Sequence, residues 1–266
     1  MRIIVLTNGS IYSNIIIQEL LKKYKHDVVS IICSDCIIYK MSKFNSLLFI
    51  SKYSGYYFLW TKLYDKFKKL TYEIFCKIYN KNKNVLRISK IAKQYKIPLY
   101  FTNDLNNKTD YKRLIKSKPD LILSISFNQI LNEKIINSAT YGVINIHPSL
   151  LPEYSGLMPY FWVLLNNENK TGVTLHWVDS KIDTGKIIYQ DEVSIDVCET
   201  MSSLAYKLSI VGADIVNNAL ESLNNNKMLS YQQNKNQRTY YSWPTKYDIK
   251  RFKQDGKKFG CIYNYL

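Results

Sequence analysis

The sequence lacks a hydrophobic run long enough to cross a membrane, and it lacks a secretory leader. No apolar stretch approaches the roughly 18 uncharged residues that a spanning helix needs. The chain begins with Met1-Arg2 and continues directly into the apolar run Ile3–Leu6. Because that run is typical of a buried strand and not of a signal peptide, we expect a cytoplasmic protein whose thiols are reduced.

Paired cysteine motifs are also missing. The spacing Cys33-x-x-Cys36 occurs in zinc and redox sites, but no second pair follows it, and both residues lie in the apolar run 31–38. We therefore predict buried strand thiols at these two positions. The odd total of five is consistent with reduced cysteines, at positions Cys33, Cys36, Cys76, Cys198 and Cys261.

Acidic residues are scarce relative to basic ones. The chain has 37 Lys and Arg against 21 Asp and Glu, which gives a formal net charge of +16. Such an excess fits a nucleic acid, an anionic membrane surface or a phosphorylated substrate as partner. The alternative is that Lys, Asn, Tyr and Ile are abundant because the genome is AT-rich, in which case much of the charge has no function.

No G-x-G-x-x-G loop is present. Asn8-Gly9-Ser10 instead follows a predicted strand at 1–7 and precedes a predicted helix around 15–21, with a second strand at 28–33. A turn of this kind before a helix can bind an anion on free backbone N–H groups, and an ordinary strand-to-helix turn is the alternative. Asn8, Gly9 and Ser10 are therefore candidate substrate-binding residues.

Apolar periodicity over the rest of the chain predicts an α/β fold with a mostly parallel sheet. We assign residues 1–225 to one domain and 226–266 to a C-terminal extension. The predicted helices are 88–95, 111–117, one near 160–162, and 200–223, and the predicted strands are 97–100, 121–125, 143–147, 172–178 and 186–190.

Residues 41–87 form an insert after the second predicted strand. Aromatic and aliphatic residues recur there at steps of three and four, lysines fill the gaps, and Asp65 and Glu73 are the only acids. This pattern predicts one or two amphipathic helices. A basic, aromatic helix can lie on an anionic membrane; we favour the alternative that the insert covers the core or forms a dimer face.

Two predicted strands bring polar side chains to their ends. In the strand 143–147 the alternation places Asn145 and His147 on one face, and Pro148 ends the strand. The strand 172–178 leads into a loop that contains Asp183. Because open α/β sheets bind ligands at strand ends, these three side chains could converge on one reacting atom. A capped strand end and an ordinary turn are the alternative.

Three sequence blocks in this region resemble the folate-dependent formyltransferases. They are Asn145–Pro152 with Gly156, Thr171–Thr174, and Asp183–Gly185. The family includes glycinamide ribonucleotide, methionyl-tRNA and sugar-nucleotide N-formyltransferases. The resemblance covers roughly residues 85–210 and is weaker at the N-terminus, and it implies a Rossmann-like formyltransferase fold.

The resemblance implies that 10-formyltetrahydrofolate is the co-substrate and that Asn145, His147 and Asp183 are catalytic. Asn145 would donate its amide N–H to the oxyanion, a stabilisation worth roughly 3 kcal/mol when well aimed. His147 would transfer a proton or hydrogen-bond the oxyanion, while Asp183 orients it and accepts a proton through water. No step requires a metal. The implied folate contacts are Phe127, Asn128, Gln129, Ile130, Leu131 and Asp179, and Ser149 is an implied substrate contact.

Two other classes of protein are alternatives to a formyltransferase. His147, His176 and Asp183 could bind a divalent metal for hydrolysis, although no local His-x-x-x-His element is present. The same fold could also serve as a non-catalytic module that binds a membrane or a nucleic acid. The presence of all three catalytic candidates favours the enzyme.

The acceptor is assigned by elimination. Glycinamide ribonucleotide enzymes are usually shorter and have a fuller glycine loop, and the segment after the last predicted helix is too short for the C-terminal barrel of a methionyl-tRNA enzyme. Two departures from relatives are Ser155 and Gln129, where some relatives have Arg. We expect a small amine acceptor, a nucleotide-linked amino sugar, with the other two acceptors as alternatives. A homodimer and a peripheral membrane contact are left open, and a nucleic-acid partner is not favoured.

Overall fold

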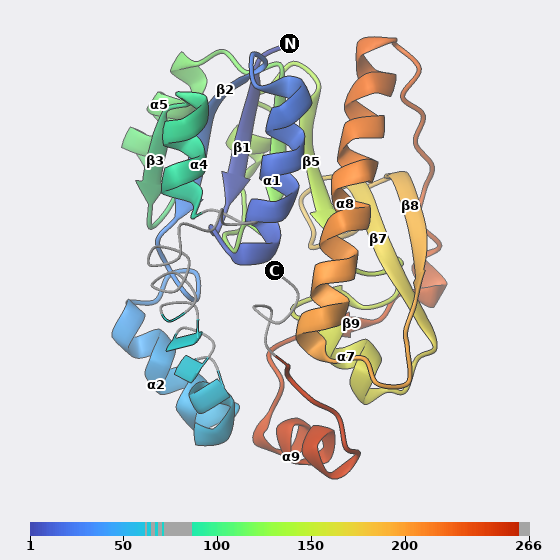
Figure 1. Ribbon diagram of the computed structural model, residues 1–266. Helices are drawn as coiled ribbons and strands as arrows, with labels where there is room; N and C mark the ends of the chain where they lie inside the picture. The colour runs from blue at the N-terminus through green and yellow to red at the C-terminus, as the bar shows by residue number, and fades with distance from the viewer. Residues whose placement is uncertain (62, 65–66, 69–70, 72–86, 261–266) are drawn as a thin grey trace.

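A computed structural model describes residues 1–61, 63–64, 67–68, 71 and 87–260. A central sheet carries helices on both faces, and further helices lie beyond its carboxyl edge (Figure 1). This confirms the predicted α/β fold. No helix within the described ranges is long and apolar enough to cross a membrane.

The central sheet has seven strands in the order β3-β2-β1-β4-β5-β7-β8. The first five are parallel, β7 runs antiparallel to them beside β5, and β8 at the edge is antiparallel to β7. After β1 the chain adds β2 and β3 on one side of the sheet, whereas after β4 it adds β5 on the other side. A ligand crevice is therefore expected at the carboxyl ends of β1 and β4, where the strand order reverses. The strands are β1 (Ile3–Thr7), β2 (Val28–Ser34), β3 (Leu99–Thr102), β4 (Leu121–Ile125), β5 (Gly142–His147), β7 (Lys170–Trp177) and β8 (Ile187–Ser194).

Two layers of helices bury the two faces of this sheet. Ile3 and Val5 of β1 face a core shared with α1 (Ile11–Tyr24), α4 (Ile88–Tyr95) and α8 (Met201–Asn224). Ile4 and Leu6 face a second core, to which α5 (Lys108–Lys116) and α6 (Glu133–Ile136) contribute. Burial on both faces explains why β1 and β4 are apolar at nearly every position.

The predicted helices and strands are all present, with ends shifted by a few residues. The strand 121–125 and the helix 88–95 have the predicted bounds. The elements that were not predicted are short: α6, the 3-10 helix Lys235–Gln237, the two-residue strands β6 (Ser155–Gly156) and β9 (Tyr240–Tyr241), and α9 (Lys246–Gln254). β6 and β9 pair with each other although they are far apart in sequence, so no local sequence pattern predicts them.

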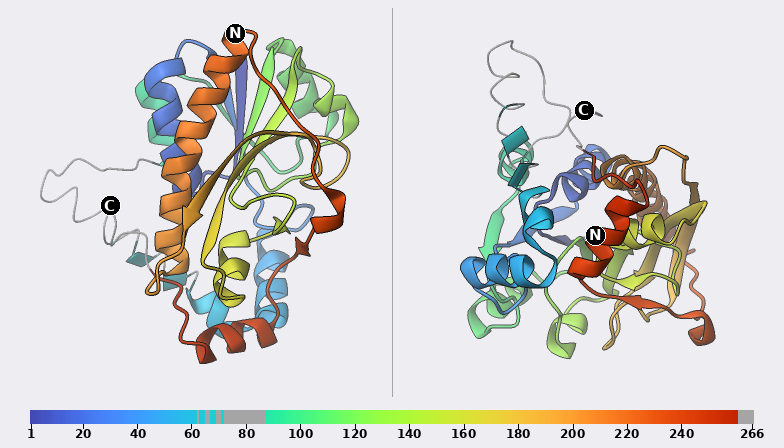
Figure 2. Two further views of the ribbon diagram at one scale, coloured as in Figure 1. Left: turned by 90° about the vertical axis from the view of Figure 1, so that its right-hand side faces the viewer. Right: turned by 90° about the horizontal axis from the view of Figure 1, so that it is seen from below.

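The C-terminal segment packs into the body of the protein. β9 pairs with β6, and α9 packs against α7 (Pro159–Leu165). The ring of Phe252 in α9 stacks on Phe161 of α7 with centroids 4.6 Å apart, and Phe259 joins the same cluster. Figure 2 shows this segment descending past the sheet and ending beneath it. The described part of the predicted extension therefore shares one core with the preceding residues.

The insert begins with α2 (Lys43–Tyr53), which confirms a helix there, and residues 56–61 are also helical. Ile50 and Phe58 are buried against the body, as expected for a segment that covers the core. Many other apolar side chains of the insert are exposed, contrary to that expectation. The remainder of the predicted helical region, 62, 65–66, 69–70 and 72–86, lies outside the described residues.

The cysteine prediction is right for one residue and wrong for another. Cys33 is buried in β2, where burial, with the nearby Asp35 carboxylate, raises the pKa of its thiol to about 11. Cys36 lies beyond the end of β2 and is only half-buried, because the chain leaves the sheet at Ser34. Cys198 is exposed, and Cys76 and Cys261 lie outside the described residues.

We expect Phe252→Ala to lower the free energy of unfolding by about 3–5 kcal/mol, because it leaves a cavity in a fully buried aromatic cluster. Tyr247→Ala in the same helix removes an exposed ring and should change stability little. Urea unfolding followed by circular dichroism measures both. A small effect of Phe252→Ala would mean that α9 is not part of the main cooperative core.

Candidate active site

The strand β5 presents Asn145 and His147 on the predicted face. Val143 belongs to the second core, whereas Ile144 and Ile146 belong to the first, which confirms the alternation. The antiparallel strand β7 lies beside β5 and places His176 opposite Asn145. Residues directly opposite each other in an antiparallel pair share a face. His176 therefore joins the two predicted residues.

Asp183 reaches this face from the loop after β7. Its Oδ2 lies 3.6 Å from Nδ1 of His147, and its Oδ1 lies 3.5 Å from Nε2 of His176. The amide nitrogen of Asn145 is 3.2 Å from the same Nε2. The structure thus brings the three predicted catalytic residues together, with His176 between Asn145 and Asp183.

Two glycines allow the loops to approach this closely. Gly156 donates its N–H to Asp183 Oδ2 at 2.8 Å and has φ of +96°, and an added Cβ would lie 2.2 Å from the carbonyl oxygen of Tyr241. At Gly185 an added Cβ would lie 1.7 Å from the carbonyl oxygen of Trp177. Since neither position can hold a side chain without moving backbone, both glycines are needed to place Asp183.

Backbone carbonyls determine how the two histidines are oriented. Nε2–H of His147 donates to the carbonyl of Tyr154 at 2.9 Å, so Nδ1 faces Asp183. Nδ1–H of His176 donates to the carbonyl of Trp177 at 2.8 Å. A carbonyl can only accept, so each of these ring nitrogens carries a proton. In neutral His176 the other nitrogen, Nε2, is then free to accept a hydrogen bond from Asn145.

The amide of Asn145 is held in one orientation. The hydroxyl of Ser124, on the neighbouring strand β4, donates to Asn145 Oδ1 at 2.8 Å. The amide nitrogen therefore points toward His176. An amide nitrogen carries two N–H groups, and the contact with His176 uses one of them. The second N–H is available to a ligand oxygen.

Asp183 is ionised at neutral pH. Burial by itself raises the pKa of its carboxyl, but the electrostatic interaction with His147, the contact with His176 and the N–H of Gly156 outweigh that effect. The net result is a pKa well below the usual range for Asp. A buried carboxylate bracketed by two imidazoles can take part in proton transfer.

The predicted substrate turn lies at the carboxyl end of β1. Sheet register aligns Thr7 of β1 with Ile125 of β4, and Ile125 with Ile146 of β5, so Asn8-Gly9-Ser10 follows the same edge as His147. Ser10 caps α1 by accepting the N–H of Ser13, and Asn8 accepts the N–H of Ser10. A ligand role for these three residues stays a prediction.

The predicted folate segment begins directly after β4, with Phe127 and Leu131 packed against the second core and Ile130 exposed. The side chain of Gln129 is buried and fully occupied: it accepts the N–H of Leu105 and donates to Ser34 Oγ and to the carbonyl of Thr102. Asn128 donates to the carbonyls of Cys36 and Ile37. These contacts leave backbone groups of the segment to meet a ligand.

Two further predicted residues support loops. The hydroxyl of Ser149 is buried and donates to the carbonyl of Glu153, so in this structure it is not available to an amine substrate. Asp179 is exposed and accepts hydrogen bonds from the N–H of Lys181 and the hydroxyl of Thr184. Asp179 thereby shapes the loop that carries Asp183.

Sequence reasoning considered His176 only as a metal ligand and missed it as a partner of Asn145. The available signal was the shared face of two neighbouring strands, but their register became known only with the structure. Within the described part of the chain, no group of three or more His, Cys, Asp and Glu residues is placed to hold a metal ion.

We expect Asp183→Asn to lower the free energy of unfolding at neutral pH by roughly 3 kcal/mol, because it removes the charge from a buried pair. The pKa of Asp183 is lower in the folded chain than in the unfolded chain, where Asp titrates at about 3.9. The ionised carboxylate therefore stabilises the fold above that value, and this contribution is lost as the pH falls toward the folded pKa.

The stability difference between the native chain and Asp183→Asn should accordingly be constant near neutrality and shrink below about pH 4. Urea titrations over this pH range measure it. Asp191→Asn, which changes an exposed carboxylate on β8, is the control and should have little effect at any pH. A difference for Asp183→Asn that grows on acidification would contradict the proposed cause.

Comparison with known proteins relates this site to a family. A family model described as formyl transferase matches residues 61–220. The methionyl-tRNA formyltransferase of Geobacillus sp. (strain WCH70) is 35% identical over 178 residues, which cover 66% of this chain and 54% of that protein. The bifunctional polymyxin resistance protein ArnA of Wigglesworthia glossinidia brevipalpis is 39% identical over 141 residues, covering 53% of this chain and 22% of that protein. The chain spans about half the length of the methionyl-tRNA formyltransferases that it matches.

Solved structures share the fold. The N-formyltransferase from Helicobacter canadensis, in complex with folinic acid and dTDP-3-aminofucose, has a TM-score of 0.60 at 19% identity and covers 91% of this chain and 71% of its own. The phosphoribosylglycinamide formyltransferase from Anaplasma phagocytophilum has a TM-score of 0.60 at 19% identity, over 92% of this chain and 99% of its own. With a family model that matches more than half of its residues, the chain belongs to the formyl transferase family.

Proposed function

We propose that the chain transfers the formyl group of 10-formyltetrahydrofolate to a primary amine. The observation that carries this proposal is the cluster of Asn145, His147, His176 and Asp183 within the region that matches the family. The folate co-substrate is supported by two neighbours of the same fold. One is described as solved with folinic acid, and the other, a sugar 3N-formyl transferase, in the presence of 5-N-formyl-THF.

The amide of Asn145 stabilises the oxyanion. The amine nitrogen attacks the formyl carbon, and the π electrons of the carbonyl move onto its oxygen. The N–H of Asn145 that is not engaged by His176 donates to this developing charge. Because Ser124 and His176 hold the amide from both ends, it needs no reorientation as the charge forms.

Asp183 and His147 manage the protons. An ammonium group must first lose a proton to expose its lone pair, and the ionised Asp183 accepts that proton through water. Nδ1 of His147 lies 3.6 Å from Asp183 and can take the proton onward. After attack the amine nitrogen loses a second proton to N10 of the folate, and the bond between N10 and the formyl carbon breaks. The products are a formamide and tetrahydrofolate.

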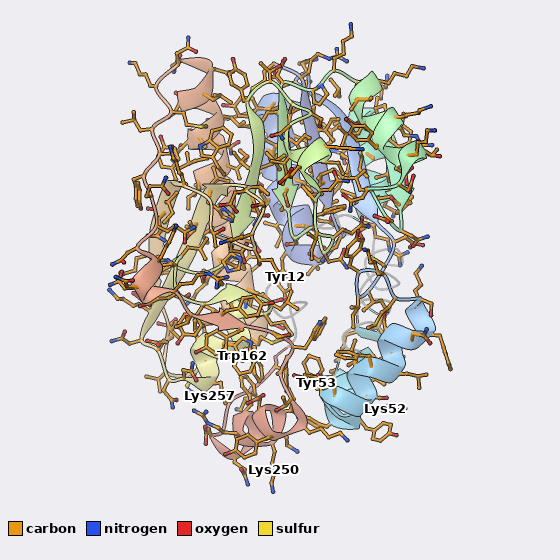
Figure 3. All side chains as sticks on the ribbon, turned by 180° about the vertical axis from the view of Figure 1, so that it is seen from behind. Tyr12, Lys52, Tyr53, Trp162, Lys250 and Lys257 are labelled. Carbon is orange, nitrogen blue, oxygen red and sulfur yellow. The ribbon has the colours of Figure 1, made fainter. Side chains whose placement is uncertain are left out.

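For the acceptor we propose a nucleotide-linked amino sugar. Lys52 of α2, Lys250 of α9 and Lys257 carry positive charge below the carboxyl edge of the sheet, where Figure 3 also shows Tyr53 and Trp162. Lysines can attract a diphosphate, and aromatic rings offer surfaces for a base. The complex of the Helicobacter canadensis enzyme with dTDP-3-aminofucose supports this choice by analogy of fold.

A methionyl-tRNA acceptor is the second candidate, because the relatives most similar in sequence include several methionyl-tRNA formyltransferases at 33–35% identity. The formal charge of +16 suits a nucleic acid as well as a nucleotide sugar. Glycinamide ribonucleotide is a third acceptor of the same reaction class, used by structural neighbours.

We expect Asn145→Ala and His147→Ala each to lower kcat/KM for formyl transfer by about 10²- to 10³-fold, because each removes a group that acts on the transition state. His26→Ala changes the only histidine outside the cluster, which is exposed, and should leave the rate unchanged. Steady-state assays with 10-formyltetrahydrofolate measure all three. Full turnover in both cluster variants would refute the site.

An acceptor panel tests the finer proposal. It contains dTDP- and UDP-linked amino sugars, glycinamide ribonucleotide and methionyl-tRNA, assayed at equal enzyme concentration. We expect turnover of an amino sugar nucleotide to exceed that of the other two classes. Turnover of methionyl-tRNA alone would establish the second candidate. Calorimetry with 5-formyltetrahydrofolate reports co-substrate binding separately, and absence of binding would overturn the proposal as a whole.

A further inference from the structure

The helix α2 exposes Phe44, Leu47 and Leu48, and two of its three buried residues are small and polar, the third being Ile50. Ser46 and Ser51 face inward and are buried, and their hydroxyls donate to the backbone carbonyls of Ser42 and Leu48. Phe44, in contrast, is 71% exposed. A helix that covers a core normally has the reverse arrangement.

The exposed apolar surface continues beyond α2. Trp60 is 61% exposed and stacks on the ring of Tyr64 with centroids 5.4 Å apart. Of the 25 large hydrophobic side chains that are exposed among the described residues, 12 lie between positions 37 and 67. We call the following set the aromatic face: Phe44, Leu47, Leu48, Tyr56, Trp60, Leu63 and Phe67.

Other residues attach this segment to the body. Phe58 is fully buried and packs edge-on against Trp243, and it also contacts Phe259. The hydroxyl of Ser54 donates to the carbonyl of Pro244 at 2.6 Å. The residues of the aromatic face are exposed and take no part in these contacts, and Figures 1 and 2 show α2 projecting from the sheet. The fold therefore does not need the aromatic face for its own packing.

The sequence of this segment carries mostly positive charge, and Lys43 of α2 pairs with Asp35, which directly precedes the segment. Between positions 36 and 72 the sequence has seven lysines, and Asp65 is the only acidic residue. Lys52 and Lys68 are exposed there. A partner for this surface must accept apolar side chains and carry negative charge.

Two kinds of partner fit these observations poorly. Nucleic acid can stack on aromatic rings and pair with lysines, but Leu47, Leu48 and Leu63 offer neither interaction. A second copy of the chain that used the same face would bring two strongly basic surfaces together, with few acidic residues to compensate. An anionic bilayer meets both requirements, because its acyl region accepts aromatic and aliphatic side chains and its headgroups attract lysine.

We propose that the aromatic face docks the protein on the surface of an anionic lipid bilayer. Trp60, Phe44 and the leucines enter the headgroup boundary, and the surrounding lysines contact the lipid phosphates. The contact is peripheral. It leaves the cluster around Asp183 unchanged and is independent of the proposed formyl transfer.

Vesicle flotation of the full chain tests this proposal. We expect binding to vesicles of phosphatidylcholine and phosphatidylglycerol in equal parts, little binding to pure phosphatidylcholine, and weaker binding at high salt. The double variant Phe44→Ser, Trp60→Ser should weaken binding to the anionic vesicles by at least about tenfold. The control Val197→Ser, Leu229→Ser removes two apolar side chains elsewhere that are more exposed than Phe44 and Trp60, and it should bind as the native chain does.

Circular dichroism and the formylation assay run alongside check that the variants fold. Lys68→Glu is a second variant that leaves the apolar residues in place, and it should also weaken binding. Failure of the native chain to bind anionic vesicles would overturn the proposal, as would equal binding by the double variant and its control. A native dimer that the double variant converts to a monomer would assign the aromatic face to a second copy and overturn the proposal.

Discussion

The candidate site depends on one buried carboxylate. Asp183 is held by the N–H of Gly156 and lies between the imidazoles of His147 and His176. A buried charge of this kind is tolerated only when it is paired, so the loops that carry these groups must keep their positions for the fold to persist. The same pairing keeps Asp183 ionised, which is the protonation state that the proposed reaction needs.

Sheet topology supplies the framework for that pairing. The parallel strands end at one edge, and the antiparallel strand β7 returns along β5 so that His176 stands opposite Asn145. The C-terminal segment also supports the site, because β9 pairs with β6, which contains Gly156. Four segments that are distant in sequence thus lie at the same edge of the sheet, near residues 10, 145, 183 and 240. Membership of the formyl transferase family relates this edge to formyl transfer.

Most of the fold could be predicted from local pattern. Continuous apolar runs marked β1 and β4, and three- and four-residue spacing marked α4 and α8. The same reasoning predicted that Asn145, His147 and Asp183 converge, and the structure brings them together around His176. Sequence reasoning did not find the pair β6 and β9, since this pairing joins residues far apart in sequence, and it also missed α9, although the capping box of Thr245 and Asp248 is a local signal for a helix. It also expected the insert to cover the core or to form a dimer face; Ile50 and Phe58 are buried against the core, and many other apolar side chains of the insert are exposed.

Local sequence alone predicted which residues alternate across a strand and which side chains can carry a proton, because these properties depend on neighbours in the chain. The tertiary structure decided that His176 joins Asn145, that the side chain of Gln129 is consumed by internal hydrogen bonds, and that the hydroxyl of Ser149 is buried. It also decided that Phe252 of the C-terminal segment belongs to the core. These outcomes depend on strand register and on packing between distant segments, and no local pattern encodes either.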